Sequence, residues 1–311
     1  MTVLPIFGPE RVNGGVAFVP PLSGLKLGGV KRGYGNVELH NAVGSGAPGV
    51  AIVPLHVGYI QDGAQNHALC RSALVAPGQH VVFDDACCVQ QAQGGFLEGR
   101  EQWFFILPLA LREAALLARG VKAFGKLWPA IAKLNTRLGL EPRGHLEQIF
   151  CRQRPVLTQY QSRFELLPGQ TGALFLLRGR LAGVEIAPTA DYFSEVWMPL
   201  VCFCYGAAAL ELERPQPACQ PPASAQPLPA ATLPRLRAAL AESRQSRLRA
   251  LYDSLAAAPA ERFEKREEER LLGLRLFTAI GQSFAGQYVL DEGRLAYASL
   301  SARARFMPGL T

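Results

Sequence analysis

Apolar and polar positions alternate over short distances in roughly the first hundred residues. The segment "NVELHNAV" at 36–43 alternates, and "GVAIVPLHVG" at 49–58 is a nearly continuous apolar run rich in β-branched residues. A period of two is typical of strands that bury one face. Gly, Pro, Asn and Asp gather between the runs, where they supply turn conformations that other residues resist. This part of the chain is therefore predicted to be rich in β-strands.

The periodicity changes near residue 108. Apolar residues recur at spacings of three, four and seven, which predicts one face of a helix: Leu117, Val121, Phe124, Trp128, Ile131 and Leu138. Proline cannot donate a backbone hydrogen bond and is tolerated in the first turn of a helix. Pro129 is therefore predicted either to kink this helix or to begin a second one.

Strand-like segments return at 163–187, where two strands are predicted to flank an Arg-Gly-Arg turn. A helix is predicted over about 190–212. It contains the longest charge-free apolar stretch, residues 196–210. That stretch is shorter than the roughly 20 residues needed to cross a bilayer, so we predict a buried helix and no membrane span.

The last third of the chain opens with a proline-rich segment at 213–234, which predicts an extended linker. Residues 235–272 are predicted to be a helical insertion, with an amphipathic helix followed by a charged one over 260–272. A terminal β-hairpin is predicted to turn at Asp-Glu-Gly 291–293. Because so few strands cannot stand alone, we expect them to join the earlier strands. The chain 1–311 is thus predicted to be a single α+β domain, with a mainly antiparallel β core and three or four packing helices.

A short internal similarity places Pro-Gly-Gln before a strand in "APGQHVVF" at 76–83 and in "LPGQTGALF" at 167–175. Proline followed by glycine is favoured at the centre of a type II turn. Two type II turns are therefore predicted. Whether they also mark a duplicated β unit stays open.

The composition agrees with a globular chain. Of 311 residues, 49% are hydrophobic and 18% charged, so a sizeable core can be buried and global disorder is excluded. The first residues, "MTVLPIFGPERVNGG", lack the features of a signal peptide. Seven cysteines without such a signal predict a cytoplasmic protein whose thiols are reduced and packed as small hydrophobes.

The net charge of +7 is concentrated in one segment. Between Arg112 and Arg154 there are nine Lys or Arg and three Glu, an excess of six positive charges. Such a face can meet nucleic acid, an acidic lipid surface or an acidic protein. It can equally be an ordinary solvated helix face, and the residues leave both interpretations open.

Several chemical motifs are absent or out of context. "GSGAPG" at 44–49 matches G-x-G-x-x-G, but a strand-like segment follows it where the dinucleotide fingerprint requires a helix. Zinc ligation by His67, Cys70 and Cys87-Cys88 is disfavoured, because adjacent cysteines on a strand point to opposite sides. No metal and no cofactor are predicted.

The stretch "QDGAQNHALCRSALV" at 61–75 contains the candidate site. As a reaction centre it would use His67 as a base and Cys70 as a nucleophile. As a recognition surface it offers amide donors and acceptors and the guanidinium fork of Arg71. A third interpretation is a loop whose side chains bond their own backbone. The sequence leaves open whether the protein is an enzyme.

Five stretches in a fixed order resemble the ARG and rhodanese-phosphatase-superfamily-associated protein domain, a bacterial family without an established activity. They are "GYIQDGAQNHALCRSALVAPGQ", a strand with "CCV", "LLPGQTGALFLLRGRLAGVEI", "VWMPLVCFCYGAAALE" and "AGQYVLDEGRLAYASLSA". The resemblance covers about Val16 to Ala302, apart from the proline-rich segment. In the family name, ARG means ADP-ribosylglycohydrolase.

Three positions depart from the pattern of the family. His67 stands where the family pattern has arginine after Gly-x-Gln-Asn, and Gln90 stands where Cys-Val is followed by glutamate. An Arg-Trp pair is separated here by inserted residues within "QGGFLEGREQW". These differences imply an altered or lost contact in this chain.

The resemblance implies a cytoplasmic ligand-binding or accessory protein linked to NAD, ADP-ribose or nucleotide processing. A hydrolase that uses His67 and Cys70, and a scaffold with a basic helical face, remain as alternatives. The predicted ligand-binding residues are Gln61, Asp62, Gln65, Asn66, His67, Arg71, Gln170 and Glu185.

Overall fold

The computed structural model describes residues 1–8, 16–28, 34–42, 49–92, 94–95, 103–213, 231–256, 260–307 and 309. The chain divides into two compact units. One contains Met1–Glu213 and Phe263–Thr311, and the other is Arg214–Arg262. In the second unit the described element is the helix α8 (Leu233–Ala256), which agrees with the amphipathic helix predicted there. The predicted linker falls mostly outside the described residues.

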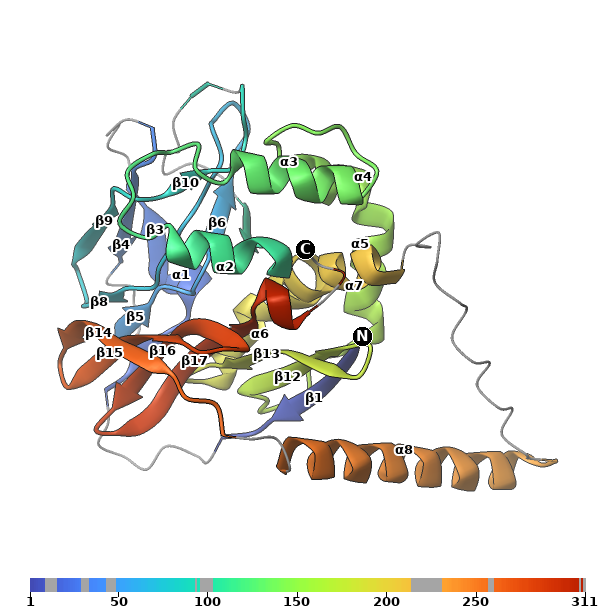
Figure 1. Cartoon of the computed structure of the whole chain (residues 1–311). Coiled ribbons are helices and arrows are strands. Elements are labelled where there is room, and N and C mark those ends of the chain that lie inside the picture. The colour runs from blue at the N-terminus through green and yellow to red at the C-terminus, as the bar shows by residue number, and fades with distance from the viewer. Residues whose placement is uncertain are drawn as a thin grey trace. The chain divides into compact units, whose positions relative to one another are not determined.

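The strands of the first unit are mostly short before residue 110 and longer after residue 170 (Figure 1). Their bounds are β1 (Thr2–Ile6), β2 (Phe18–Val19), β3 (Leu25–Leu27), β4 (Val37–Asn41), β5 (Val50–Ile52), β6 (Val57–Ile60), β7 (His67–Ala68), β8 (Leu74–Val75), β9 (His80–Phe83), β10 (Cys87–Cys88), β11 (Trp103–Ile106), β12 (Gly172–Leu177), β13 (Arg180–Ile186), β14 (Glu264–Leu271), β15 (Leu274–Ile280), β16 (Phe284–Asp291) and β17 (Arg294–Ala302).

Helices occupy most of the segment between residues 109 and 213. The helices of this unit are α1 (Pro21–Gly24), α2 (Leu109–Leu117), α3 (Trp128–Arg137), α4 (Glu147–Arg152), α5 (Arg154–Arg163), α6 (Ala190–Met198), the π-helical segment η1 (Pro199–Gly206), α7 (Ala207–Glu213) and the short 3-10 turn η2 (Ala304–Phe306). The α+β class with mostly antiparallel sheets is therefore confirmed, with more helices than the three or four predicted.

The largest sheet has seven antiparallel strands in the order β1-β12-β13-β17-β16-β15-β14. Three of its hairpins close through two residues with positive φ, Arg178–Gly179, Leu272–Gly273 and Glu292–Gly293. Positive φ at both positions gives a type I′ turn, which matches the natural twist of paired strands. The predicted turns at 178–180 and 291–293 are confirmed. Because β17 pairs with β13, the terminal strands do join the earlier ones.

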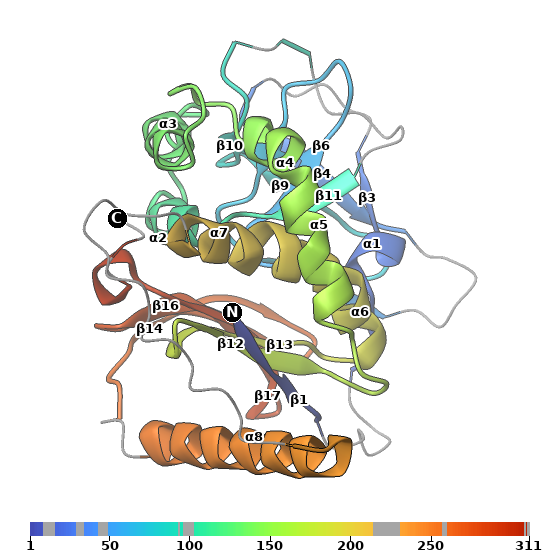
Figure 2. The same ribbon diagram turned by 90° about the vertical axis from the view of Figure 1, so that its right-hand side faces the viewer.

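A layer of helices covers one face of this sheet. Figure 2 shows α2, α5 and the continuous rod of α6, η1 and α7 between the seven-stranded sheet and the smaller sheets. The rod, Ala190–Glu213, is long and apolar enough to cross a membrane, but 78% of its apolar stretch is buried inside the molecule. Tyr205 on η1 stacks on Phe175 of β12, with ring centroids 3.9 Å apart. The predicted buried helix is therefore the central helix of the core.

The N-terminal half builds three small sheets above this layer. Their strand orders are β10-β7-β6-β11, β2-β5-β8 and β3-β4-β9. Strand β11 contacts η1, which joins the small sheets to the helical layer. The polar stretch 61–75 lies in this half, around β7 and β8. Residues 44–48 of "GSGAPG" lie outside the described residues.

The apolar periodicity between 117 and 138 does not form one helix. Helix α2 ends at Leu117, and α3 begins at Trp128 with Pro129 in its first turn. Gly120 has a φ of 78°, which interrupts the helical backbone between them. Leu117 and Val121 are exposed, at 54% and 47%, so they line no buried face. Of the two roles predicted for Pro129, the start of a second helix is confirmed.

The charged helix predicted over 260–272 is wrong for most of that segment. Glu264–Leu271 is β14, which pairs antiparallel with β15 at the edge of the large sheet. Its Glu, Lys and Arg residues favour a helix locally, but pairing with an apolar partner strand decides the conformation.

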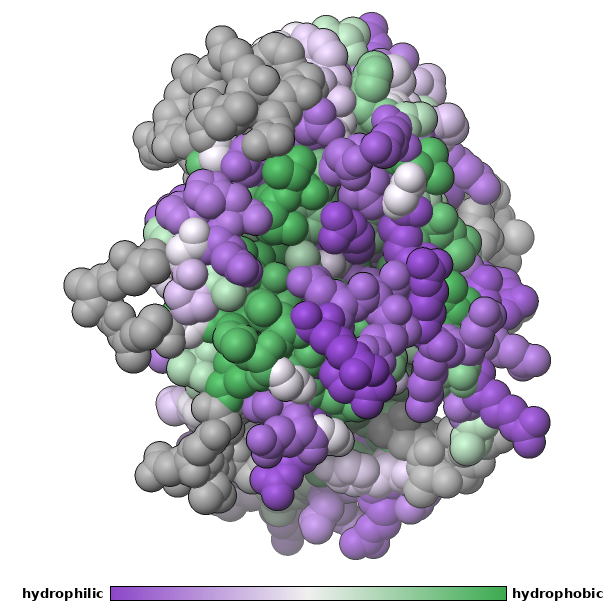
Figure 3. Space-filling view, turned by 90° about the vertical axis from the view of Figure 1, so that its left-hand side faces the viewer, coloured by the Kyte–Doolittle hydropathy of each residue, from purple (hydrophilic) through white to green (hydrophobic). Residues whose placement is uncertain are grey.

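Figure 3 looks onto the side where β8, β9 and β14 lie, and hydrophilic side chains surround a band of apolar ones. Charge on an edge strand blocks pairing with other chains.

The two Pro-Gly-Gln turns have the same geometry. In each, the glutamine N–H donates to the carbonyl three residues earlier, at 3.0 Å for Gln79 and 3.1 Å for Gln170. Each side-chain Oε1 then accepts from the backbone N–H of that earlier residue. Gly78 and Gly169 have φ of 73° and 75°, which type II turns require of their third residue. Both predicted turns are confirmed.

Candidate ligand site

The amides of the polar stretch organise its own backbone. The Oδ1 of Asn66 accepts from the backbone N–H of Gln61 at 3.0 Å, which closes the turn between β6 and β7. The Nδ2 of Asn66 donates to Gln90, and Gln90 donates to Glu147 at 2.6 Å. Gln61, Gln65 and Asn66 are buried. Asp62 is exposed at the tip of the turn.

Both ring nitrogens of His67 are bonded to the backbone. Its Nδ1 donates to the carbonyl of Gln65 at 2.6 Å, and its Nε2 accepts from the N–H of Gly35 at 3.0 Å. This pattern requires the neutral imidazole. Burial lowers the pKa of His67 to about 4, although the bond to Gln65 acts in the opposite direction. In this arrangement His67 fixes the loop of Gly35 against β7.

Cys70 is paired with Cys87 rather than with His67. The two Sγ atoms lie 2.8 Å apart, and both side chains are buried. A nucleophilic dyad requires the base within hydrogen-bond reach of the sulfur. The described residues therefore form no Cys70–His67 dyad. All six described cysteines are free thiols, and five of them are buried, as predicted.

Arg71 is the cation of this stretch that reaches the surface, with 31% of its side chain exposed. Its guanidinium carbon lies 4.6 Å from the centre of the Phe83 ring, which is a cation–π distance. Its Nε lies 3.4 Å from Oδ1 of the buried Asp85. Asp85 is itself held by the N–H of Gly120, which donates to Oδ2 at 2.7 Å. The guanidinium is thus fixed on one edge and one face.

Two further charged groups lie beside Arg71. Lys122 is 75% exposed, and its Nζ lies 2.6 Å from Oδ2 of Asp84. This bond, followed by smaller contributions that include Arg71, holds the pKa of Asp84 below its ordinary value. Arg71 and Lys122 therefore flank one exposed carboxylate on the surface.

Gln170 and Glu185 are not brought to the polar stretch by any contact among the described residues. Gln170 is buried, and both ends of its amide bond the turn at 167–172. Glu185 lies on β13 in the helical layer's contact with the large sheet. Its Oε1 accepts hydrogen bonds from Arg112 Nη1 and from the Tyr205 hydroxyl, both at 2.6 Å. Its Oε2 accepts a hydrogen bond from the Ser299 hydroxyl, also at 2.6 Å.

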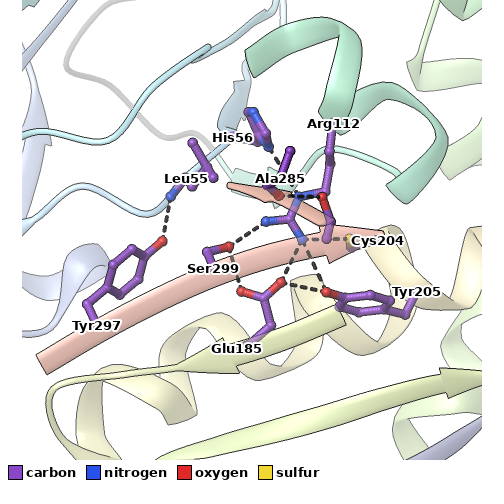
Figure 4. Close-up of polar contacts among 10 residues, drawn as sticks. Leu55, His56, Arg112, Glu185, Cys204, Tyr205, Ala285, Tyr297 and Ser299 are labelled. Carbon is purple, nitrogen blue, oxygen red and sulfur yellow. Dashed lines mark hydrogen bonds and ion pairs between the residues drawn. The ribbon is translucent and has the colours of Figure 1, made fainter. Parts of the chain in front are cut away.

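Figure 4 shows that the fully buried guanidinium of Arg112 lies at the centre of this cluster. The hydroxyls of Tyr205 and Ser299 each donate to Glu185 and accept from Arg112, so each hydroxyl uses both of its functions. Burial is the largest single influence and acts to lower the pKa of Arg112, but the charge of Glu185, the neighbouring Cys204 and Tyr205, and the hydrogen bond to Glu185 together outweigh it, so the pKa is raised. Arg112 therefore keeps its charge inside the core.

His56 completes the cluster on the other side of Arg112. Its Nδ1 accepts from Arg112 Nε at 3.2 Å, so Nε2 carries the proton, and this buried atom has no partner among the described residues. Burial, followed by the charge of Arg112, lowers the pKa of His56 well below its ordinary value. The backbone φ of His56 is 64°, a left-handed value that costs energy outside glycine.

Sequence reasoning missed this cluster, although Glu185 was among the predicted residues. The available signal was Arg112, which with its neighbour Glu113 supplies the only charges of the otherwise apolar helix α2, "LALREAALL". A charge on the buried face of a helix requires a buried partner. Which partner it finds depends on β13, η1 and β17, which lie far along the chain.

The cavities near these residues differ in size. A cavity of about 20 Å³ is lined in part by Glu185, Tyr192 and Tyr297, which is room for about one water. An open groove of about 320 Å³ lies between β1 and the end of α5, with Arg163, Gln170 and Trp197 among its lining residues. The groove has a size at which small-molecule sites begin. Among the described residues that line this groove, Gln170 is the only one that was predicted to bind a ligand.

Acidic partners neutralise much of the basic segment between Arg112 and Arg154. Five of its nine cations form ion pairs: Arg112 with Glu185, Arg119 with Glu268, Lys122 with Asp84, Arg137 with Glu211 and Arg143 with Glu141. The segment therefore offers an acidic partner less charge than the sequence count suggests. Across the part of the chain that the structure describes, no group of three His, Cys, Asp or Glu residues is placed to hold a metal.

These features define a mixed α+β protein with a structural core of polar residues and one anchored, partly exposed arginine. The family model of the ARG and Rhodanese-Phosphatase-superfamily-associated Protein domain matches residues 1–300, and the chain belongs to this family. The family is associated with the ADP-ribosylglycohydrolase and rhodanese-phosphatase families. No curated protein and no solved structure matches the chain.

Proposed function

We propose that this protein is a ligand-binding accessory protein of ADP-ribose or nucleotide processing, and that Arg71 binds the phosphates of its ligand. The proposal rests chiefly on one observation. Arg71 is held by Phe83 and Asp85, while neither terminal nitrogen of its guanidinium has a hydrogen-bond partner among the described residues. A planar guanidinium presented in this way suits two oxygens of a phosphate.

Fixing the arginine in advance favours binding. A mobile arginine loses about 0.5–1.5 kcal/mol of side-chain freedom when a ligand immobilises it. The stacking of Arg71 on Phe83 and its contact with Asp85 have already restricted that freedom. The side-chain amide of Asn66 and the backbone groups of Gln61 and Gln65 take a supporting part in the proposal, because they fix the turn that precedes β7 and Arg71.

The geometry of the candidate catalytic residues favours binding over hydrolysis. His67 uses both nitrogens on backbone groups, and its pKa of about 4 leaves it neutral but already bonded at neutral pH. The sulfur of Cys70 is hydrogen-bonded to the sulfur of Cys87. A general base or nucleophile must instead reach the reacting atom of the ligand.

The test is isothermal titration calorimetry of the full chain with ADP-ribose, NAD and ADP. Arg71→Ala is expected to weaken binding by about tenfold to a hundredfold, because a hydrogen bond to a charged group contributes about 1.5–3 kcal/mol. Arg71→Lys keeps the charge but loses the fork, so it should restore affinity only in part.

The matched control is Arg163→Ala, which removes an exposed arginine from the groove between β1 and α5. This variant is expected to bind as tightly as the unaltered protein. If it loses affinity while Arg71→Ala does not, the ligand lies in the groove and the proposal for Arg71 is wrong. If the unaltered protein gives no heat with any of the three ligands, the nucleotide proposal is wrong as a whole.

A further inference from the structure

Two cysteines from neighbouring strand segments meet beneath the surface loop of residues 118–127. Cys87 lies in β10 opposite Ala68 of β7, and Cys70 follows two residues after Ala68. Cys70 itself lies in the bend that follows β7. The Sγ atoms of Cys70 and Cys87 lie 2.8 Å apart, although their positions in the chain differ by 17.

The next cysteine along β10 has different contacts. Cys88 is also buried, but its Sγ lies 3.4 Å from the carbonyl of Gln90 and from the N–H of the same residue. Its backbone N–H donates to the carbonyl of Phe124 at 2.8 Å. Cys88 is therefore a neighbour of equal burial whose sulfur bonds Gln90 rather than Cys70.

A cation lies at the sulfur pair. The ammonium of Lys126 donates to the carbonyl of Asp85 at 2.6 Å, and its charge acts to lower the pKa of Cys70. The Cys87 hydrogen bond, more than the charge of Lys126, lowers the pKa of Cys70, and burial opposes both. The same hydrogen bond and burial raise the pKa of Cys87. Either sulfur can be the donor of the hydrogen bond between them, and the lowered pKa favours Cys70 as the attacking thiolate.

We propose that Cys70 and Cys87 form a redox-active dithiol that a low-molecular-weight disulfide oxidises to an intrachain disulfide. The thiolate of Cys70 attacks one sulfur of the disulfide RSSR and releases RS⁻. Cys87 then gives up its proton and attacks the Cys70 sulfur of the mixed disulfide, which releases the second RS⁻. The two protein thiols lose two electrons and two protons, and RSSR becomes two RSH.

The geometry needs little adjustment for this reaction. A disulfide bond is about 2.05 Å long, so the sulfurs must approach by only about 0.8 Å from their separation of 2.8 Å. Access for the oxidant requires the covering loop to open. Residues 120–124 of that loop are exposed, and Lys126 of the same loop donates to the carbonyl of Asp85. This inference does not depend on the proposed ligand.

The experiment uses the reduced full chain, which is incubated with oxidised glutathione, quenched in acid and digested with trypsin without reduction. Cleavage after Arg71 separates Cys70 from Cys87, whereas Cys87 and Cys88 remain in one fragment. Mass spectrometry is expected to find the Cys70 fragment linked to that fragment, with the loss of two titratable thiols per chain. Cys202 and Cys204, which are buried in η1, should stay reduced.

Single variants identify the pair. Cys88→Ser should retain the cross-link, whereas Cys87→Ser should lose it and accumulate a glutathione adduct on Cys70. A cross-link that survives in Cys87→Ser and disappears in Cys88→Ser would show that Cys88 is the partner of Cys70, and it would contradict the proposal. If the unaltered protein keeps both thiols under these conditions, the proposal is wrong, whether or not the variants fold.

Discussion

The buried ion pair of Arg112 and Glu185 gives a prediction whose size follows from the structure. Arg112→Met removes the guanidinium and leaves a shorter, uncharged side chain. Loss of the guanidinium leaves Glu185 in the core with two hydroxyl donors, Tyr205 and Ser299, and with no cation among its contacts. Both of those hydroxyls also lose the group whose hydrogen bonds they accept.

Removing one partner of a buried pair costs about 3–5 kcal/mol, because an uncompensated charge remains in a medium of low dielectric constant. Arg112 is fully buried, so solvent does not screen the loss. Arg112→Met is therefore expected to lower the free energy of unfolding by about 3–5 kcal/mol, a large share of the 5–15 kcal/mol typical of native proteins.

Urea unfolding followed by tryptophan fluorescence measures this change. The matched control is the double variant Arg112→Met/Glu185→Leu, because replacing both charges with apolar groups is often nearly neutral. The double variant is expected to recover most of the lost stability. If Arg112→Met lies within about 1 kcal/mol of the unaltered protein, or if the double variant is as unstable as the single one, the explanation by an unpaired buried charge fails.

Two further predictions concern His67 and Gly183. The pKa of His67 is about 4 in the folded protein and about 6.5 in the unfolded chain, so stability is lost as the pH falls from 6.5 to 4, by about 3 kcal/mol. In urea titrations at pH 7 and pH 4, His67→Gln should lose less stability between the two pH values than the unaltered protein does. An equal loss of stability in both proteins would contradict the prediction. In Gly183→Ala the new Cβ would lie 1.9 Å from the Tyr205 hydroxyl, so we expect a loss of about 1–3 kcal/mol that Tyr205→Phe partly reverses. An unchanged urea midpoint in Gly183→Ala would show that Tyr205 moves aside without cost.

Local signals were sufficient for several elements of the fold. Gly179 and Gly293 stand where a hairpin needs positive φ, and the turns are found at both positions. The glutamines at 79 and 170 close their turns through contacts within four residues. The apolar run at 196–210 became the buried central helix because it has no charge to place in solvent.

The misassigned elements depend on contacts between distant segments. The residues of β14 favour a helix, and only pairing with β15 makes them a strand. Glu269 of β14 also accepts a hydrogen bond from the backbone N–H of Leu74 at 3.0 Å. The two residues are nearly 200 positions apart, so no local sequence pattern could predict this contact. The helix predicted through 118–127 was interrupted at Gly120, whose N–H bonds Asp85 instead.

The candidate site was predicted in position but not in the direction of its side chains. The stretch 61–71 was identified by its density of polar groups, and the side chains of Asn66 and His67 turned inward to bond backbone. Residue types alone do not distinguish a self-bonded loop from a binding surface. The exposure of Arg71 and the pairing of Cys70 with Cys87 required the positions of β9 and β10.

The central claim is that Arg71 contacts the phosphates of a nucleotide ligand. Its most direct test compares ADP-ribose with adenosine, which has no phosphate, by calorimetry on the unaltered protein and on Arg71→Ala. We predict that the unaltered protein binds ADP-ribose at least about tenfold more tightly than adenosine, and that this preference disappears in Arg71→Ala. A preference for ADP-ribose of the same size in both proteins would contradict the account.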